Sequence, residues 1–145
     1  MDEIKTPVDG SYLLDDQAGY LLRLANQRHA TIFQQNAVNG LTPTQFTALI
    51  RLSEHGKCSQ NQLGRYAAMD IATIKGVVDR LRQKGLATAE PSTEDKRRSL
   101  ISLTDTGKAL MADLTRAGHE ITQTTLDPLT AAEQRTFLKL LRKLT

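Results

Sequence analysis

The sequence predicts a mainly α-helical fold, a winged helix-turn-helix with a two-stranded β wing between long N- and C-terminal helices. Apolar residues recur at helical spacing over most of the chain, and three Ser/Thr-x-x-Glu/Gln capping boxes mark helix starts. Two short alternating segments flank a turn rich in Pro, Ser and acidic residues, which is typical of a hairpin. A chain of 145 residues is long enough for one domain with helical extensions.

The first part of the chain is expected to be an arm followed by a dimerisation helix, over residues 1–40. Residues 1–11 are polar and acidic, without the apolar region of a signal peptide. Helical spacing of apolar residues predicts a helix over residues 13–37, and Asn39 and Gly40 end this segment.

Two helices are expected next, each opened by a capping box. The box at residues 42–45, with Pro43 at the first helical position, opens a helix that Gly56 ends. The box at residues 59–62 opens a short helix that extends to about Ala67. The inner side of the first of these helices is predicted to carry Phe46, Leu49, Ile50 and Ser53.

A fourth helix and a basic hairpin complete the predicted winged helix-turn-helix, over residues 41–108. Asp70 is a good N-cap for this helix, and Gly85 ends it. Strands are expected at residues 86–90 and 99–103. The buried stripe of the helix is predicted to be Ile74, Val77, Val78 and Leu81.

The C-terminal part, residues 109–145, is predicted to supply the other dimerisation helices. Thr104 caps a long fifth helix, in which Gly118 costs roughly 1 kcal/mol of stability. The capping box at residues 130–133 opens a last helix with its own apolar stripe. Apolar stripes at both ends of the chain need a partner surface, which favours a homodimer. A monomeric helical bundle with its termini folded back is the alternative.

This order of elements is the one that places a helix in the DNA major groove and a wing on the flanking backbone or minor groove. The charge distribution agrees, because residues 57–98 hold nine Lys or Arg and five Asp or Glu, whereas the rest of the chain has ten and eleven. Double-stranded DNA is therefore the expected partner, and Asp95 is expected to hold Arg97 in one pose by a salt bridge. The predicted DNA-binding residues are Ser59, Gln60, Asn61, Ile71, Ala72, Thr73, Lys75, Gly76, Arg80, Lys96, Arg97 and Arg98.

For several of these residues a plainer interpretation stays open. Residues 59–61 are also explained by helix capping alone, and three adjacent basic residues in a turn are often a solvated surface. Gly76 either lets the backbone approach the duplex closely or is neutral on an exposed face. Ala72 and Ile71 are suited to contact with thymine methyl groups.

The chain resembles the MarR (multiple antibiotic resistance regulator) family of bacterial transcription factors. The resemblance is carried by LTPTQFTALIRL (41–52), VVDRLRQKGL (77–86) and EDKRRSLISLTDTGKAL (94–110), which holds a D-x-R element as Asp95 and Arg97. It implies a winged-helix homodimer that binds palindromic operators, usually represses, and is often released by small aromatic acids. Regulators of aromatic acid breakdown, such as nicotinate pathways, look similar. The stretch Thr88-Ala89-Glu90 departs from the family, which often has basic residues there.

A small aromatic carboxylate is the expected effector, and no other cofactor is expected. A histidine and arginines at the rim of an apolar crevice suit such a ligand, although an interfacial histidine and ordinary surface arginines explain the same residues. The predicted ligand-binding residues are Arg23, Asn26, His29, Phe33 and Arg51.

Other classes of function are weighed against this one. A redox-sensing regulator would use Cys58, the only cysteine, whose plainer interpretation is a small loop residue. A winged helix that docks to proteins and never meets DNA would have an apolar recognition face, but the face here is polar and basic. An enzyme is disfavoured, because the histidines are scattered and neither metal-ligand spacing nor a phosphate loop occurs. The chain is expected to be cytoplasmic, without a membrane partner.

Overall fold

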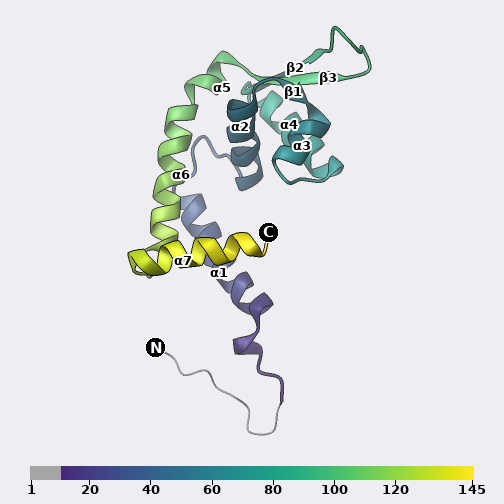
Figure 1. Cartoon of the computed structure of the whole chain (residues 1–145). Helices are drawn as coiled ribbons and strands as arrows, with labels where there is room; N and C mark the ends of the chain where they lie inside the picture. Colours follow the sequence, from purple (N-terminus) through teal and green to yellow (C-terminus); the bar gives the residue numbers. More distant parts are fainter. Residues whose placement is uncertain (1–10) are drawn as a thin grey trace. The chain divides into compact units, whose positions relative to one another are not determined.

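The computed structural model describes residues 11–145, and this part of the chain divides into two compact units (Figure 1). The helical unit contains the described residues up to Asn36 together with Glu120–Thr145. The winged unit is the continuous segment Ala37–His119. The fold is the predicted one, mainly helical with a small antiparallel sheet.

The winged unit begins with three helices at the predicted capping signals. These are α2 (Pro43–His55), α3 (Gln60–Tyr66) and α4 (Ile71–Gln83). In both α2 and α3 the capping box is complete. The N-cap hydroxyl accepts a hydrogen bond from the backbone N–H of the Gln three residues later, and the side-chain oxygen of that Gln accepts one from the N-cap backbone N–H. Gly56 ends α2 with a φ of +74°, which a residue with a Cβ rarely adopts.

The sheet has three strands, in the order β1 (Cys58–Ser59), β3 (Ser99–Leu103), β2 (Ala87–Pro91). The hairpin of β2 and β3 is the predicted wing, with Ala87 opposite Leu103 and Pro91 opposite Ser99. The third strand was not predicted. Cys58 therefore lies in a strand opposite Ile101, and not in a loop as expected.

The core of the winged unit is closed by the inner faces of its helices and the sheet. The predicted stripe of α4 is buried, and Leu49, Leu63 and Leu86 are fully buried with it. On α2 the prediction was partly wrong, because Ser53 is exposed while Ala48 and Leu52 are buried. The inner side of α2 is thus turned by about one residue from the predicted one, and Phe46 and Ile50 pack at its margin.

One junction fastens the end of α4, the wing and the next helix. The Thr104 hydroxyl donates to the Gly85 carbonyl oxygen at 2.6 Å and accepts a hydrogen bond from the Gly107 backbone N–H at 3.1 Å. The Thr104 N–H donates to the Leu86 carbonyl oxygen. Gly107 packs so closely on Leu86 that a Cβ there would run into that carbonyl.

The predicted long fifth helix is two helices, α5 (Asp105–Ala109) and α6 (Met111–Leu126). The chain leaves the α-helical pattern at Leu110, which follows α5 as its C-cap. Gly118 in α6 has a packing reason, since a Cβ there would lie 3.2 Å from the Phe46 ring. The glycine therefore makes room for an aromatic side chain of α2.

The helical unit contains α1 (Ala18–Gln35), the end of α6, and α7 (Ala131–Lys143). A short 3-10 turn, Leu14–Asp16, precedes α1, so the first helix begins later than predicted. Arg28 joins α1 to the end of α6, because its guanidinium donates to the carbonyl oxygens of Thr124 and Thr125. A positive side chain at a helix C-terminus satisfies free carbonyls and opposes the helix dipole.

Candidate nucleic-acid interface and ligand pocket

The start of α4 is rigidly held, and its outer face is open. The Asp70 carboxylate accepts a hydrogen bond from the Thr73 backbone N–H at 2.7 Å. This bond also lowers the pKa of Asp70, because it favours the charged form. The predicted DNA-binding residues of this helix are all exposed, whereas Ile74, Val77 and Val78 are buried behind them.

The outer face of α4 is polar with one apolar projection. Lys75 pairs with Asp79 at 3.1 Å, on the same exposed side of the helix. Ile71 is 74% exposed. At Gly76 a Cβ would find no atom within 4 Å, so packing within the chain does not require a glycine there.

A basic crevice of about 350 Å³ lies between α3 and residues 97–99 of the wing, next to its turn. Arg65 of α3 and Arg97 and Arg98 of the wing all line it. No carboxylate lines this crevice, so its three guanidinium groups favour an anion. The other lining residues are Ser59, Gln60, Asn61, Gln62 and Ser99.

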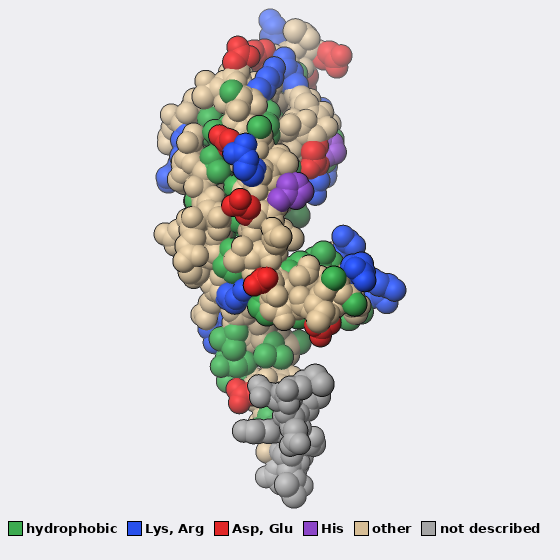
Figure 2. All heavy atoms as spheres, turned by 90° about the vertical axis from the view of Figure 1, so that its left-hand side faces the viewer, with side chains coloured by type: hydrophobic (Ala, Val, Ile, Leu, Met, Phe, Trp, Pro, Cys, Tyr) green, Lys and Arg blue, Asp and Glu red, His purple; other side chains and the backbone are tan. Residues whose placement is uncertain are grey.

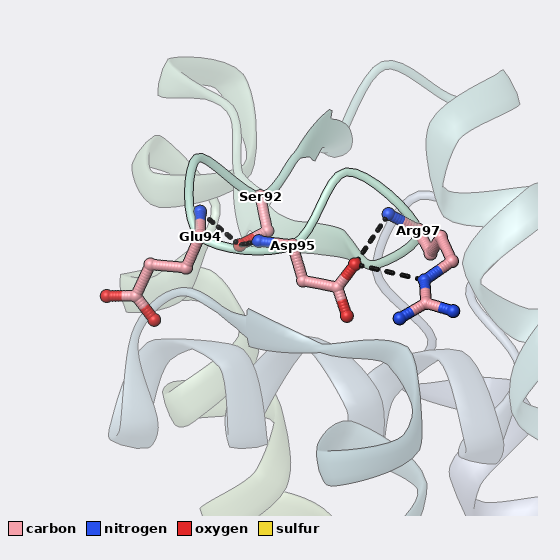
Figure 3. A network of polar contacts seen from close by, with 4 residues as sticks. All are labelled: Ser92, Glu94, Asp95 and Arg97. Atoms are coloured by element: carbon pink, nitrogen blue, oxygen red, sulfur yellow. Dashed lines mark hydrogen bonds and ion pairs between the residues drawn. The ribbon is translucent and has the colours of Figure 1, made fainter.

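The tip of the wing is ordered by a small network of polar contacts (Figure 3). The Ser92 hydroxyl accepts hydrogen bonds from the backbone N–H groups of Glu94 and Asp95. The Asp95 carboxylate accepts from the Arg97 backbone N–H at 3.0 Å and lies 3.4 Å from its Nε. The Arg97 side chain is nevertheless 93% exposed, so Asp95 holds it through Nε while most of the side chain stays open to a partner.

The wing carries both signs of charge. Figure 2 shows Lys and Arg side chains in blue and acidic ones in red at its upper end, where the wing lies. Glu90, in β2, is paired with Lys57 at 3.6 Å. The acidic residue that departs from the family pattern is thus partly neutralised within the chain. Lys96, Arg97 and Arg98 are the basic residues at the turn.

A separate apolar pocket of about 310 Å³ lies within the helical unit. The predicted ligand residues Asn26 and His29 both line it. His29 Nδ1 lies 2.9 Å from the Thr125 hydroxyl, which fixes the ring orientation. Apolar side chains make up most of the lining, and they are Leu22, Ala25, Leu126, Phe137, Leu138 and Leu141.

The other predicted ligand residues lie elsewhere in the described chain. Arg23 stands over the Tyr20 ring at 5.5 Å, an exposed cation–π contact. Phe33 is buried in the helical unit but does not line the pocket. Arg51 belongs to the winged unit and pairs with Glu54 at 2.7 Å.

The helical unit leaves many apolar side chains uncovered. Leu140 is 53% exposed and Leu144 is 73% exposed. Green hydrophobic side chains gather in the lower half of Figure 2. The exposed large hydrophobic residues of this unit are Tyr12, Leu14, Leu21, Leu22, Leu24, Phe137, Leu140 and Leu144.

Cys58 is poorly placed for redox sensing. It is buried in β1, and this burial raises the pKa of its thiol. Because the thiolate is the reactive form, a raised pKa lowers its reactivity with oxidants. Burial and the raised pKa both count against the redox alternative for this residue.

Sequence reasoning missed two groups of residues at these sites. Arg65 was overlooked because it lies on a helix whose other residues are explained by capping and packing. Thr122 and Thr125 were overlooked because threonines in a helix carry no signal until the facing helix is known.

Among residues 11–145, no cluster of His, Cys, Asp or Glu is suited to hold a metal ion. No helix in that same part of the chain has the length and hydropathy of a membrane span.

Comparison with known proteins decides the family. The family model described as "MarR family" matches residues 41–99. The HTH-type transcriptional repressor NicR of Pseudomonas putida is 39% identical over 140 residues, covering 95% of this chain and 89% of NicR. The chain belongs to the MarR family. The predicted resemblance is confirmed, and with it the function of a transcriptional regulator.

Solved structures of MarR-family regulators have the same fold. A probable transcriptional regulator from Pseudomonas aeruginosa is 51% identical, with a TM-score of 0.88 over 92% of this chain and 100% of that one. BpsR of Bordetella bronchiseptica is 38% identical, with a TM-score of 0.87 over 93% of this chain and 97% of its own. Its structure concerns the regulation of DNA binding by 6-hydroxynicotinic acid.

Proposed function

We propose that this MarR-family protein is a ligand-responsive repressor that binds palindromic operator DNA as a homodimer. The single observation that carries DNA binding is the combination, within the winged unit, of an exposed, capped α4 and a crevice lined by three arginines. Both features lie in the winged unit, and both are suited to nucleic acid.

In this proposal the DNA contacts divide into two kinds. Thr73 and Lys75 of α4 reach base edges or phosphates in the major groove, and Arg80 follows two turns after Thr73 and is also exposed. The basic crevice between α3 and the wing seats backbone phosphate, with Arg65 and Arg98 as its cations. Arg97, with its base fixed by Asp95, extends from the wing into the minor groove.

The homodimer is supported by the uncovered apolar side chains of the helical unit. A second copy related by a two-fold axis buries the same residues on both chains. The same axis gives the operator its inverted repeat, because two recognition helices meet major grooves roughly 34–36 Å apart.

The effector is proposed to be a small aromatic acid bound in the apolar pocket of the helical unit. The pocket's apolar lining suits one aromatic ring, and Asn26, His29 and the threonines offer hydrogen bonds to polar substituents. The relation to BpsR makes 6-hydroxynicotinic acid the first compound to test. Arg23 and Arg51 do not line this pocket, and no role in it is proposed for them.

The experiment is a selection of genomic fragments by the purified protein, followed by a binding titration on the selected duplex. We expect an inverted repeat and an affinity that falls steeply with salt, since each phosphate contact releases counterions. 6-Hydroxynicotinic acid should release the duplex, and 2-hydroxypyridine, which lacks the carboxylate, serves as the matched control. Selection of no fragment would contradict DNA binding, and equal effects of both compounds would contradict carboxylate recognition.

A further inference from the structure

Ile71 stands out among the side chains of the winged unit. It is the one large hydrophobic side chain that the described residues of this unit leave exposed, at 74%. All the others in the described chain belong to the helical unit. Isolated exposed apolar residues are common on proteins, so exposure alone decides nothing. The position of Ile71 in its helix is what gives the exposure a meaning.

Ile71 is the first residue of α4, at the end of the helix that recognition helices present to base edges. The Asp70 cap fixes the backbone at this point. Ile74, one turn later, is buried at 1% exposure, so Ile71 extends beyond the core on a rigid support. A β-branched side chain also has few rotamers to lose on contact.

The other exposed residues at the start of α4 are small or polar. Ala72 and Thr73 have small side chains, and at Gly76 even an added Cβ would touch nothing. Ile71 is therefore the apolar projection of a surface that is otherwise small or polar. In the major groove, the apolar group that distinguishes one base pair from the others is the C5 methyl of thymine.

We propose that Ile71 reads a thymine methyl group in each operator half-site, a proposal that rests on the proposed function. The contact removes the exposed side chain and the methyl from water together, and it discriminates thymine from cytosine without any hydrogen bond. Because the dimer is two-fold symmetric, the same contact occurs twice in one operator.

The test removes single methyl groups from an operator that the protein has itself selected from a random-sequence duplex pool. Symmetry-related thymine pairs are replaced, one pair at a time, by deoxyuridine, which keeps the base pairing. One pair should prove sensitive, with affinity about fourfold lower for each methyl and about sixteenfold lower for both, the value expected for a buried CH₂-sized group. If no pair is sensitive, the proposal is overturned.

Two variants assign the effect to this residue. In Ile71→Ala the loss caused by deoxyuridine should shrink to about twofold or less, while circular dichroism and thermal melting show an intact fold. In the matched control Arg98→Ala, affinity should fall for both duplexes and their ratio should stay at about sixteenfold, because the arginine lies outside the methyl contact. A ratio that persists in Ile71→Ala would overturn the assignment.

A gain-of-binding arm separates methyl recognition from changes in duplex stiffness. At the sensitive position, cytosine should bind poorly and 5-methylcytosine should recover part of the affinity in the wild-type protein only. No recovery would contradict methyl reading. If the initial selection yields no duplex at all, the proposed function itself fails, which is a different result from binding that ignores the methyl.

Discussion

The winged unit and the helical unit treat their apolar side chains in opposite ways. In the winged unit, a closed core buries the inner faces of α2, α3, α4 and the sheet. In the helical unit, Leu140, Leu144 and six other large apolar side chains stay exposed. The winged unit thus buries its apolar side chains within a single chain, whereas the helical unit leaves an apolar surface that a second copy could cover. In the proposed function, the winged unit contacts DNA and the helical unit pairs with a second copy.

The largest expected effect comes from breaking the helical unit's surface. Leu140→Asp should shift the protein from dimer to monomer, because the exposed half of one leucine contributes about 0.8–1.5 kcal/mol on burial and the two-fold axis counts it twice. With the cost of burying two carboxylates added, we expect the dimer to lose more than about 3 kcal/mol, measured by sedimentation equilibrium. The control is Ile71→Asp, which places the same charge on the winged unit and should leave the dimer intact. A fully dimeric Leu140→Asp would show that this face is not the interface.

The next effect tests whether the wing and the basic crevice of the winged unit contact DNA. Arg97→Ala should weaken operator binding by roughly 1–3 kcal/mol, and Arg65→Ala should reduce the slope of log affinity against log salt by about 1. Gel-shift titrations over a range of salt concentrations measure both quantities. Arg116→Ala is the matched control, because Arg116 is an exposed arginine outside the basic crevice. Unchanged affinity in Arg65→Ala would remove the crevice from the interface.

A smaller effect separates stability from recognition at one position. Gly76→Ala should raise the free energy of unfolding by about 0.5–1 kcal/mol, because glycine is costly inside a helix and the added Cβ meets no atom. Operator affinity should fall if DNA approaches the α4 backbone at this point. Urea unfolding measures the change in the free energy of unfolding, and a gel-shift titration on the same preparation measures the change in operator affinity. A stabilised variant with full affinity would support the interpretation of Gly76 as neutral.

The smallest effect is a pH dependence that compares a cap in each unit. Hydrogen bonds from Thr73 and Thr130 lower the pKa values of Asp70 and Glu133, respectively. A depressed folded-state pKa contributes stability above the unfolded-state value, about 4 for these groups, and that contribution is lost as pH falls through the folded-state pKa. The melting temperature of the wild type should fall between about pH 5 and pH 2. In Asp70→Asn and in Glu133→Gln this fall should be smaller than in the wild type. A loss equal to that of the wild type would show that these carboxylates do not contribute.

Helix starts and buried helix faces could be predicted from the sequence, because each depends on residues close together in the chain. The boxes at Thr42, Ser59 and Thr130 each open a helix, and the stripe of α4 is buried as its spacing predicted. Strand β1 could not be predicted, because two residues show no periodicity and its pairing depends on β3, which lies 40 residues later in the chain. The break at Leu110 likewise has no marker in the sequence.

The candidate sites were predictable only in part for a related reason. Residues on one exposed helix face or in one turn, such as Lys75 or Arg97, follow from a local pattern. The crevice needs α3 beside the wing, so Arg65 was invisible until the sheet was placed. The pocket needs α1, α6 and α7 together, which explains why Asn26 and His29 line it while Arg23 and Phe33 do not.

The Thr104 junction couples the position of α4 to that of the wing. The hydroxyl holds the last turn before the wing and the first turn after it, and the missing Cβ of Gly107 lets the two chain segments touch. A substitution that moves the wing is therefore expected to move α4 as well. New operator preferences should arise through side-chain exchange on these two elements, while Thr104 and Gly107 tolerate almost no change.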